Sequence, residues 1–160
     1  MAKIYIASPL GFSETGRLFL YGKIVPLIEK IGCQALVPWE LTDKQGIIKV
    51  KSMSPGKRKL KARLQLNNVI GMNNEKAIEA ADGLVAVLDG TDVDSGTASE
   101  IGYGSALGKQ IIGYRSDSRL SADNESLVVN LQVEYFIRRN GGTIVRKLDE
   151  LERELKQRFG

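Results

Sequence analysis

Histidine is absent from this chain of 160 residues, and cysteine occurs once, at Cys33. The first absence excludes a Ser-His-Asp triad and a histidine-ligated metal site, and the single cysteine excludes an internal disulfide and a cluster of cysteine ligands. Acid–base chemistry near neutral pH must then fall to carboxylates, lysine, tyrosine, the cysteine or water. Carboxylates are therefore the side chains to follow along the chain.

Long apolar runs are also missing. The longest, Leu84 to Leu88, has the length of a strand and falls far short of the roughly 20 residues that cross a bilayer. Met1 leads directly into a strand-like stretch, without the apolar core and cleavage site of a signal peptide, so we expect a cytoplasmic protein. The length and a hydrophobic share of 42% predict one globular domain over residues 1–160.

Positive charge is concentrated in one segment. Residues 43–63 hold eight basic side chains and one aspartate, a net +7, whereas the whole chain carries +4 and the remainder therefore −3. The segment lacks the interleaved aromatics of a nucleic-acid-binding module. We interpret it as a solvated helix face or a flap over a site, with non-catalytic nucleotide or RNA binding as the alternative.

Strand-like and helical segments alternate along the chain, which predicts a doubly wound α/β sheet of about five parallel strands with helices on both faces. Ligands of such sheets bind beyond the carboxyl ends of the strands, so we expect the site in the loops after Ser8, Val37, Leu88 and Tyr114. Residues 42–56 have no clear period and predict a loop. The expected strands are 3–8, 33–37, 83–88, 110–114 and 143–145, and the expected helices are 14–31 with a kink at Pro26, 57–81 with an interruption near Gly71, 97–107, 124–139 and 148–158.

Carboxylate and hydroxyl side chains are most concentrated between Asp89 and Glu100, in the sequence DGTDVDSGTASE directly after the most apolar strand. Thr97 and Glu100 have the spacing of a capping box, which would give Glu100 a structural role at a helix start. Asp94 is a candidate turn residue by the same reasoning. A calcium loop fits poorly because Asp94 stands where such a loop needs glycine. A phosphate cradle fits poorly because four carboxylates repel an anion.

Clustered carboxylates without histidine suit glycosyl transfer. One carboxylate can attack an anomeric carbon and form a covalent ester, which a second acceptor then resolves. The transition state resembles an oxocarbenium ion, so nearby negative charge stabilises it more than the neutral ground state. A second carboxyl, kept protonated by its like-charged neighbours, can protonate the leaving group.

Residues 92–103, DVDSGTASEIGY, strongly resemble the signature of the nucleoside 2-deoxyribosyltransferase family. Residues 4–12, IYIASPLGF, resemble its first strand and turn, and residues 114–131 contain segments similar to its next active-site loop. The resemblance implies a flavodoxin-like fold without a cofactor or metal. It also implies a transferase of nucleoside salvage that exchanges purine and pyrimidine bases on 2′-deoxynucleosides, with retention at the anomeric carbon.

The resemblance implies roles for single residues. Glu100 matches the nucleophile, Tyr5 the tyrosine whose hydroxyl positions it, and Asp94 the aspartate that contacts and protonates the leaving base. Asn130 matches an asparagine that a neighbouring subunit lends to the 5′ end of the sugar, which implies a homo-oligomer of at least two copies. The other expected substrate contacts are Ser8, Gly11, Phe12, Asn74, Asp89, Asp92 and Gly96.

Asn74 departs from the family pattern, because many members carry a base-binding aspartate on this helix. An amide can donate and accept at an adenine edge but cannot act as an acid, so the base preference stays open. The C-terminal tyrosine that helps the site in some members has no match at Phe159. Trp39, Glu40 and Phe12 are candidates to flank the base.

The closest alternative activity is an N-glycosidase of 2′-deoxynucleoside 5′-monophosphates, in which water resolves the same covalent intermediate. Such an enzyme needs a phosphate pocket of hydroxyls and cations. The candidate ligands for that phosphate are Arg115, Ser116, Ser118 and Arg119.

Overall fold

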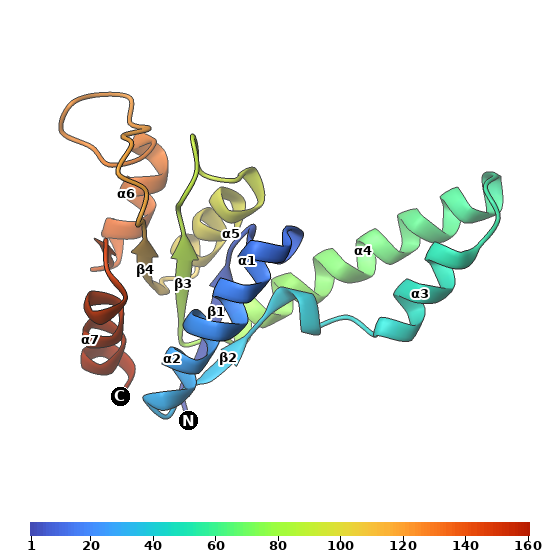
Figure 1. Ribbon diagram of the computed structural model, residues 1–160, viewed down its shortest axis with the longest axis horizontal. Helices are drawn as coiled ribbons and strands as arrows, with labels where there is room; N and C mark the ends of the chain where they lie inside the picture. Colours follow the sequence, from blue (N-terminus) through green and yellow to red (C-terminus); the bar gives the residue numbers. More distant parts are fainter.

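A sheet of five parallel strands forms the centre of the computed structural model, which describes all 160 residues (Figure 1). The strand order is β2-β1-β3-β4-β5, the flavodoxin-like arrangement, as the alternation of elements and the family resemblance predicted. The sheet places β1 and β3 side by side where the strand order reverses. The strands are β1 (Lys3–Ala7), β2 (Gln34–Leu36), β3 (Gly83–Val87), β4 (Gln110–Tyr114) and β5 (Thr143–Val145).

Helices cover both faces of the sheet, and alternation along each strand decides which side chains meet which helices. On one face Ile4 and Val85 pack against α1 (Glu14–Phe19), α2 (Val25–Lys30) and α7 (Leu148–Phe159). On the other face Tyr5 and Leu84 pack against the inner end of α4 (Lys57–Ala80), α5 (Ser95–Ala106) and α6 (Leu131–Arg139). Tyr5 therefore faces α5, the helix that carries Glu100.

The helix expected over residues 14–31 is divided by a π-helical turn, η2 (Leu20–Ile24), between α1 and α2. Pro26 lies in the first turn of α2. Proline cannot donate a backbone hydrogen bond, and its ring crowds the carbonyl four residues earlier. A wider turn immediately before it accommodates both effects and keeps the two helices nearly continuous.

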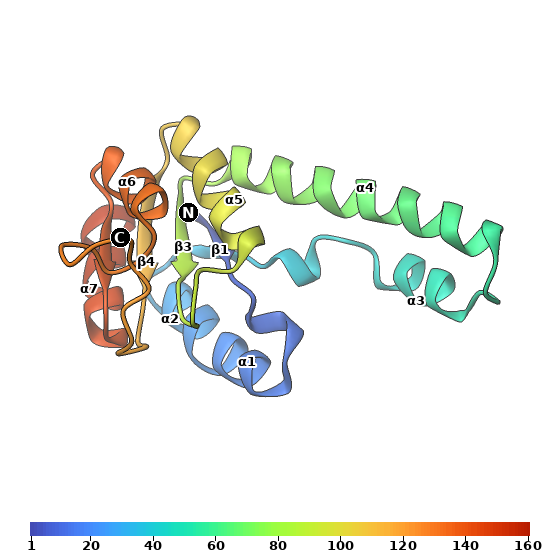
Figure 2. The same cartoon turned by 90° about the horizontal axis from the view of Figure 1, so that it is seen from above.

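Residues 42–56, expected as a loop, contain a helix, α3 (Lys44–Ser52). Its start is fixed by Asp43, whose carboxylate accepts hydrogen bonds from the backbone N–H groups of Gln45 at 3.1 Å and Gly46 at 2.8 Å. α3 packs against α4, which runs through Gly71 without the expected interruption. Residues 43–68, which we call the arm, project away from the sheet in both views (Figures 1 and 2).

Two further boundaries differ from the expectation. The helix expected over residues 124–139 begins only at Leu131, where the Asn130 side chain caps it by accepting from the N–H groups of Gln132 and Val133. The helix expected from Thr97 begins at Ser95. No helix in the structure is both long enough and apolar enough to span a bilayer.

Candidate active site

Tyr5 and Glu100 meet beneath the carboxyl end of the sheet. The Tyr5 hydroxyl donates a hydrogen bond of 2.6 Å to Oε1 of Glu100. β1 fixes Tyr5, which is fully buried, and the second turn of α5 fixes Glu100, which is half-buried. A short hydrogen bond from a buried hydroxyl holds this carboxylate in one orientation.

Burial and charge raise the pKa of Glu100. Removal from water raises the pKa most, the Tyr5 hydrogen bond opposes the shift and the nearby Asp94 carboxylate adds to it, so that the resulting pKa is about 7. The pKa of Tyr5 is raised far above its usual value by burial first and by the charge of Glu100 second. Tyr5 is therefore a permanent donor, while Glu100 changes charge near neutral pH.

Asp94 is the N-cap of α5. Its Oδ2 accepts hydrogen bonds from the N–H of Thr97 at 3.0 Å and from the Thr97 hydroxyl at 3.2 Å. The capping box expected between Thr97 and Glu100 is therefore wrong, because the helix begins two residues earlier and Thr97 itself occupies the third helical position. Glu100 has no capping role, and its carboxylate is free to face the cavity.

A cavity of about 460 Å³ opens beside these groups, a volume in the range of small-molecule sites. The segments after β1, β2 and β3 contribute its walls, as the sheet topology predicted, and α4 closes one side. The loop after β4 contributes nothing to it. The cavity is lined by Ser8, Phe12, Pro38, Trp39, Ile70, Asn74, Asp94, Ser95, Gly96, Thr97 and Glu100.

Gly11 lies against the Trp39 ring, which lines the cavity. Phe12 and Trp39 form an edge-to-face pair with ring centroids 4.5 Å apart, and both rings line the cavity. A Cβ added at Gly11 would lie 2.0 Å from Cε2 of Trp39. Gly11 is itself buried behind the cavity wall and makes room for the indole, and its expected role as a substrate contact stays a prediction.

Asn74 presents an unpartnered acceptor to the same region. Its Oδ1 is buried without a hydrogen bond and the residue lines the cavity. Asn74 and Glu100 also line a second cavity of about 410 Å³ between α4 and α5. A ligand could therefore approach Glu100 from either cavity. The second cavity is completed by Gly71, Glu75, Ile78, Gly96, Ser99 and Tyr103.

Asp89 and Asp92, two expected substrate contacts, lie outside the cavity. The Asp89 carboxylate accepts from the Ser116 hydroxyl at 2.6 Å and from the N–H of Asp117 at 2.8 Å. The Asp92 carboxylate accepts from the N–H of Val93. Asp89 thus connects the turn after β3 to the loop after β4, Asp92 shapes its own turn, and the expected roles of both as substrate contacts stay predictions. Asn130 does not line the cavity of its own chain either, and its expected role across an interface stays a prediction.

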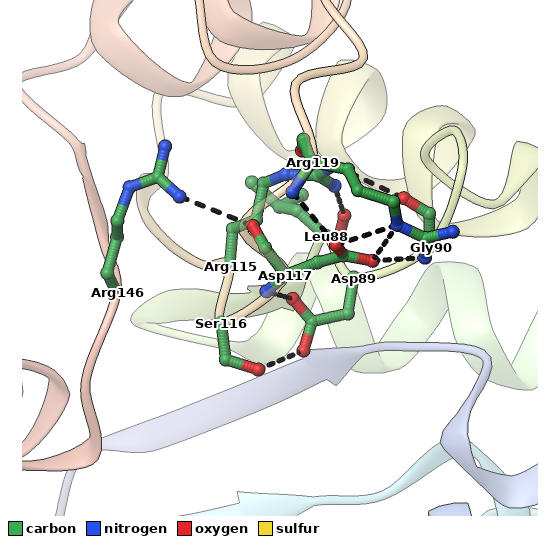
Figure 3. Close-up of polar contacts among 8 residues, drawn as sticks. All are labelled: Leu88, Asp89, Gly90, Arg115, Ser116, Asp117, Arg119 and Arg146. Carbon is green, nitrogen blue, oxygen red and sulfur yellow. Dashed lines mark hydrogen bonds and ion pairs between the residues drawn. The ribbon is translucent and has the colours of Figure 1, made fainter.

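Hydrogen bonds connect the loop after β4 to the end of β3 and the turn that follows it (Figure 3). Arg115 is fully buried, and its guanidinium donates to the carbonyls of Leu88, Gly90 and Arg119. Arg119 in turn pairs with Asp117. Both guanidinium groups have partners inside the loop, and the phosphate site of the alternative activity stays a prediction.

Sequence reasoning missed Arg115 as a structural residue and Ile70 as a wall of the cavity. A guanidinium directly after a buried strand was the available signal for Arg115. No feature of the sequence indicated Ile70, because its place at the cavity depends on where α4 crosses the sheet.

A model of the nucleoside 2-deoxyribosyltransferase family matches residues 4–132 of this chain. The chain belongs to this family. That match spans β1, the acidic turn and the start of α6, so it includes Tyr5, Asp94, Glu100 and Asn130.

Two further proteins are similar to most of this chain. An uncharacterized protein of Schizosaccharomyces pombe is 29% identical over 121 residues, which are 73% of this chain and 51% of that protein. The chain thus spans about half the length of this curated relative. Among solved structures, a conserved protein of Enterococcus faecalis is 27% identical with a TM-score of 0.69, and the match covers 99% of each chain.

Two structures of known activity share the fold. A 2-deoxyribosyltransferase of Leishmania mexicana has a TM-score of 0.65 at 21% identity, with 100% of both chains covered. A CMP N-glycosidase of Clostridium botulinum has a TM-score of 0.55 at 20% identity, with 97% of this chain and 98% of that chain covered. The same fold thus carries both a transferase and a hydrolase.

Proposed function

We propose that this protein exchanges bases on 2′-deoxynucleosides through a covalent deoxyribosyl ester on Glu100. The observation that carries the proposal is the 2.6 Å hydrogen bond from Tyr5 to Glu100 at the wall of a nucleoside-sized cavity. A glutamate held by a buried hydroxyl, beside a second carboxylate and without a capping role, is suited to attack an anomeric carbon.

In the first step an ionised Glu100 oxygen attacks the anomeric carbon. The bond from that carbon to the base nitrogen breaks, and its electron pair leaves with the base, which takes a proton from Asp94. The sugar then forms an ester with Glu100. A 2′-deoxy sugar favours this path, because an electron-withdrawing hydroxyl beside the anomeric carbon would destabilise the developing cation.

In the second step a nitrogen of the incoming base attacks the same carbon. The ester bond breaks and its electrons return to Glu100, while the proton of the incoming nitrogen passes to Asp94. Two inversions give net retention. Phe12 and Trp39 would flank the base, and Asn74 would offer it a donor and an acceptor.

Asn130 remains the proposed contribution of a second copy to the 5′ end of the sugar. In its own chain the Asn130 side chain caps α6 and contacts Asp123 at 3.5 Å. Asn130 is half-buried and the adjacent Leu131 is 49% exposed, so a neighbouring subunit could reach this end of α6.

Incubation with deoxyinosine and adenine tests the proposed activity. We expect deoxyadenosine and hypoxanthine to accumulate faster than free deoxyribose, and Glu100→Gln to abolish both products. Deoxycytidine 5′-monophosphate is the matched hydrolase substrate. Release of deoxyribose 5-phosphate from it, without base exchange on nucleosides, would replace the transferase by the N-glycosidase.

A further inference from the structure

The two carboxylate oxygens of Asp94 have different surroundings. Oδ2 accepts hydrogen bonds from the backbone N–H of Thr97 at 3.0 Å and from the Thr97 hydroxyl at 3.2 Å. Oδ1 makes no hydrogen bond within the chain, and Asp94 lines the cavity beside Glu100. The carboxylate is therefore held through one oxygen, and the other oxygen is left for a ligand.

The Thr97 hydroxyl exceeds what a helix cap requires, since such a cap is made with backbone N–H groups. The side chains of Ser13, Asp43 and Asn130 cap α1, α3 and α6, and each accepts only a backbone N–H from the third helical position, which holds glycine or valine. In α5 the third position holds Thr97, whose hydroxyl adds a second donor to the same oxygen. Of these four capping residues, Asp94 is the one that lines the cavity.

The surroundings of Oδ2 also restrict its movement. A Cβ added at Gly96 would lie 3.1 Å from Oδ2 of Asp94, which is closer than ordinary van der Waals contact. Thr97 is only 1% exposed, so water does not compete for its hydroxyl. A rotation that exchanged the two oxygens of Asp94 would break both hydrogen bonds where no water replaces them, so the carboxylate keeps one orientation.

This arrangement decides which oxygen of Asp94 carries a proton. The carbonyl oxygen of a carboxylic acid accepts hydrogen bonds better than its hydroxyl oxygen does, so two donors at Oδ2 favour the proton on Oδ1. The proton then lies on the oxygen that has no partner in the chain, from which it can pass to a ligand. After the transfer both donors of Thr97 stabilise the carboxylate that remains.

We propose that Thr97 is a positioning residue that directs the proton of Asp94 to the leaving base. The inference rests on the proposed function, in which Asp94 protonates the base as its bond to the anomeric carbon breaks. The O–H bond at Oδ1 breaks, and a base nitrogen gains that proton. The electron pair of the broken glycosidic bond stays on the base, while the Thr97 hydroxyl donates to Oδ2 before and after the transfer.

The choice of leaving group separates this role from a structural one. The hypoxanthine of deoxyinosine takes a proton as it leaves, whereas a 4-nitrophenyl 2-deoxyriboside releases a phenolate that is stable without one. Thr97→Val keeps the backbone N–H and the size of the side chain but removes the hydroxyl. With enzyme in excess, a single turnover measures the release of either leaving group without the second step.

We expect Thr97→Val to slow the release of hypoxanthine about tenfold or more and the release of nitrophenolate less than about threefold. The substrate concentration that gives half the maximal rate should stay unchanged for both. Thr97→Ser keeps the hydroxyl and should remain within about threefold of wild type for hypoxanthine. Ser105→Ala is the matched control, since it removes a buried hydroxyl from the same helix outside both cavities, and it should change neither rate.

Other results overturn the proposal. Equal losses for the two substrates in Thr97→Val would mean that the hydroxyl only supports the start of α5, and a wild-type rate of hypoxanthine release would leave it without a role. Thr97→Ala also removes the hydroxyl, and it provides the same contrast if the valine variant does not fold. A wild-type protein that releases neither leaving group would overturn the proposed function and this inference with it, whereas equal losses overturn the inference alone.

Discussion

Tyr5 and Glu100 are 95 positions apart in the chain, and the sheet brings the hydroxyl of one to 2.6 Å from the carboxylate of the other. The contact depends on alternation in β1, which turns Tyr5 toward the face that α5 covers. It also depends on the start of α5 at Ser95, which sets the rotation of the helix and hence the direction of Glu100. The nucleophile proposed here is therefore positioned by the fold rather than by its neighbours in sequence.

Tyr5→Phe should shift the pH dependence of activity. The hydroxyl lowers the pKa of Glu100, so its loss raises that pKa above its value of about 7. Since the ionised carboxylate is the nucleophile, we expect a loss of roughly 10- to 100-fold at pH 7 and partial recovery at higher pH. The rate of base exchange between pH 5 and pH 9 measures this. An unshifted profile would contradict the positioning role.

Glu100→Gln should reduce base exchange by about 10³-fold or more and leave the fold intact. Glutamine can still accept from the Tyr5 hydroxyl but cannot form the ester. Circular dichroism controls for folding. Incubation with a slow-leaving fluorinated deoxynucleoside should add the mass of one sugar to wild type and none to the variant, and a variant that still gains this mass would move the nucleophile elsewhere.

The same variant should be more stable than wild type at alkaline pH. The pKa of Glu100 is raised from 4.5 to about 7, so above pH 4.5 the folded state retains a proton that the unfolded state has released. Wild-type stability is therefore lost as pH rises from about 4.5 to 7, by on the order of 3 kcal/mol. Melting temperatures of the two proteins should nearly agree at pH 4 and differ at pH 8. An equal difference at both values would contradict the raised pKa.

The sheet could be predicted from sequence because its information is local. Continuous apolar runs predicted β3 and β4. Gly32 and Gly108 have positive φ and follow the ends of helices, as expected. α3 could not be predicted in this way. Its helix depends on the cap from Asp43 and on packing against α4, and neither is visible in the periodicity of a short basic segment.

The sequence predicted only part of the candidate site. Resemblance to a family located Tyr5, Asp94 and Glu100, whose side chains the fold brings together. It did not reveal that the Asp89 carboxylate accepts from Ser116 and Asp117 in the loop after β4, or that the Asp92 carboxylate accepts from the N–H of Val93, because such hydrogen bonds depend on backbone direction rather than on residue type.

Gly11→Ala should weaken both substrate binding and the fold. The new Cβ would lie 2.0 Å from the Trp39 ring, which must move within the cavity wall. We expect a several-fold higher KM and a loss of about 1–3 kcal/mol in unfolding free energy. Gly22→Ala is the control, since a Cβ there meets no atom within 4 Å. Equal KM values for the two variants would exclude the packing role of Gly11.

Arg115→Met should destabilise the protein by about 3 kcal/mol or more. The substitution preserves much of the side-chain volume but removes the donor to the buried carbonyl of Leu88 and to the partly buried carbonyls of Gly90 and Arg119, and a buried unsatisfied group costs about 1–3 kcal/mol. Arg119→Met removes only an ion pair whose arginine is exposed, so it should cost less than about 1 kcal/mol. Urea unfolding followed by circular dichroism compares them. Similar midpoints for both variants would mean that Arg115 does not hold the turn after β3, and the path from that turn to Asp94 would need another support.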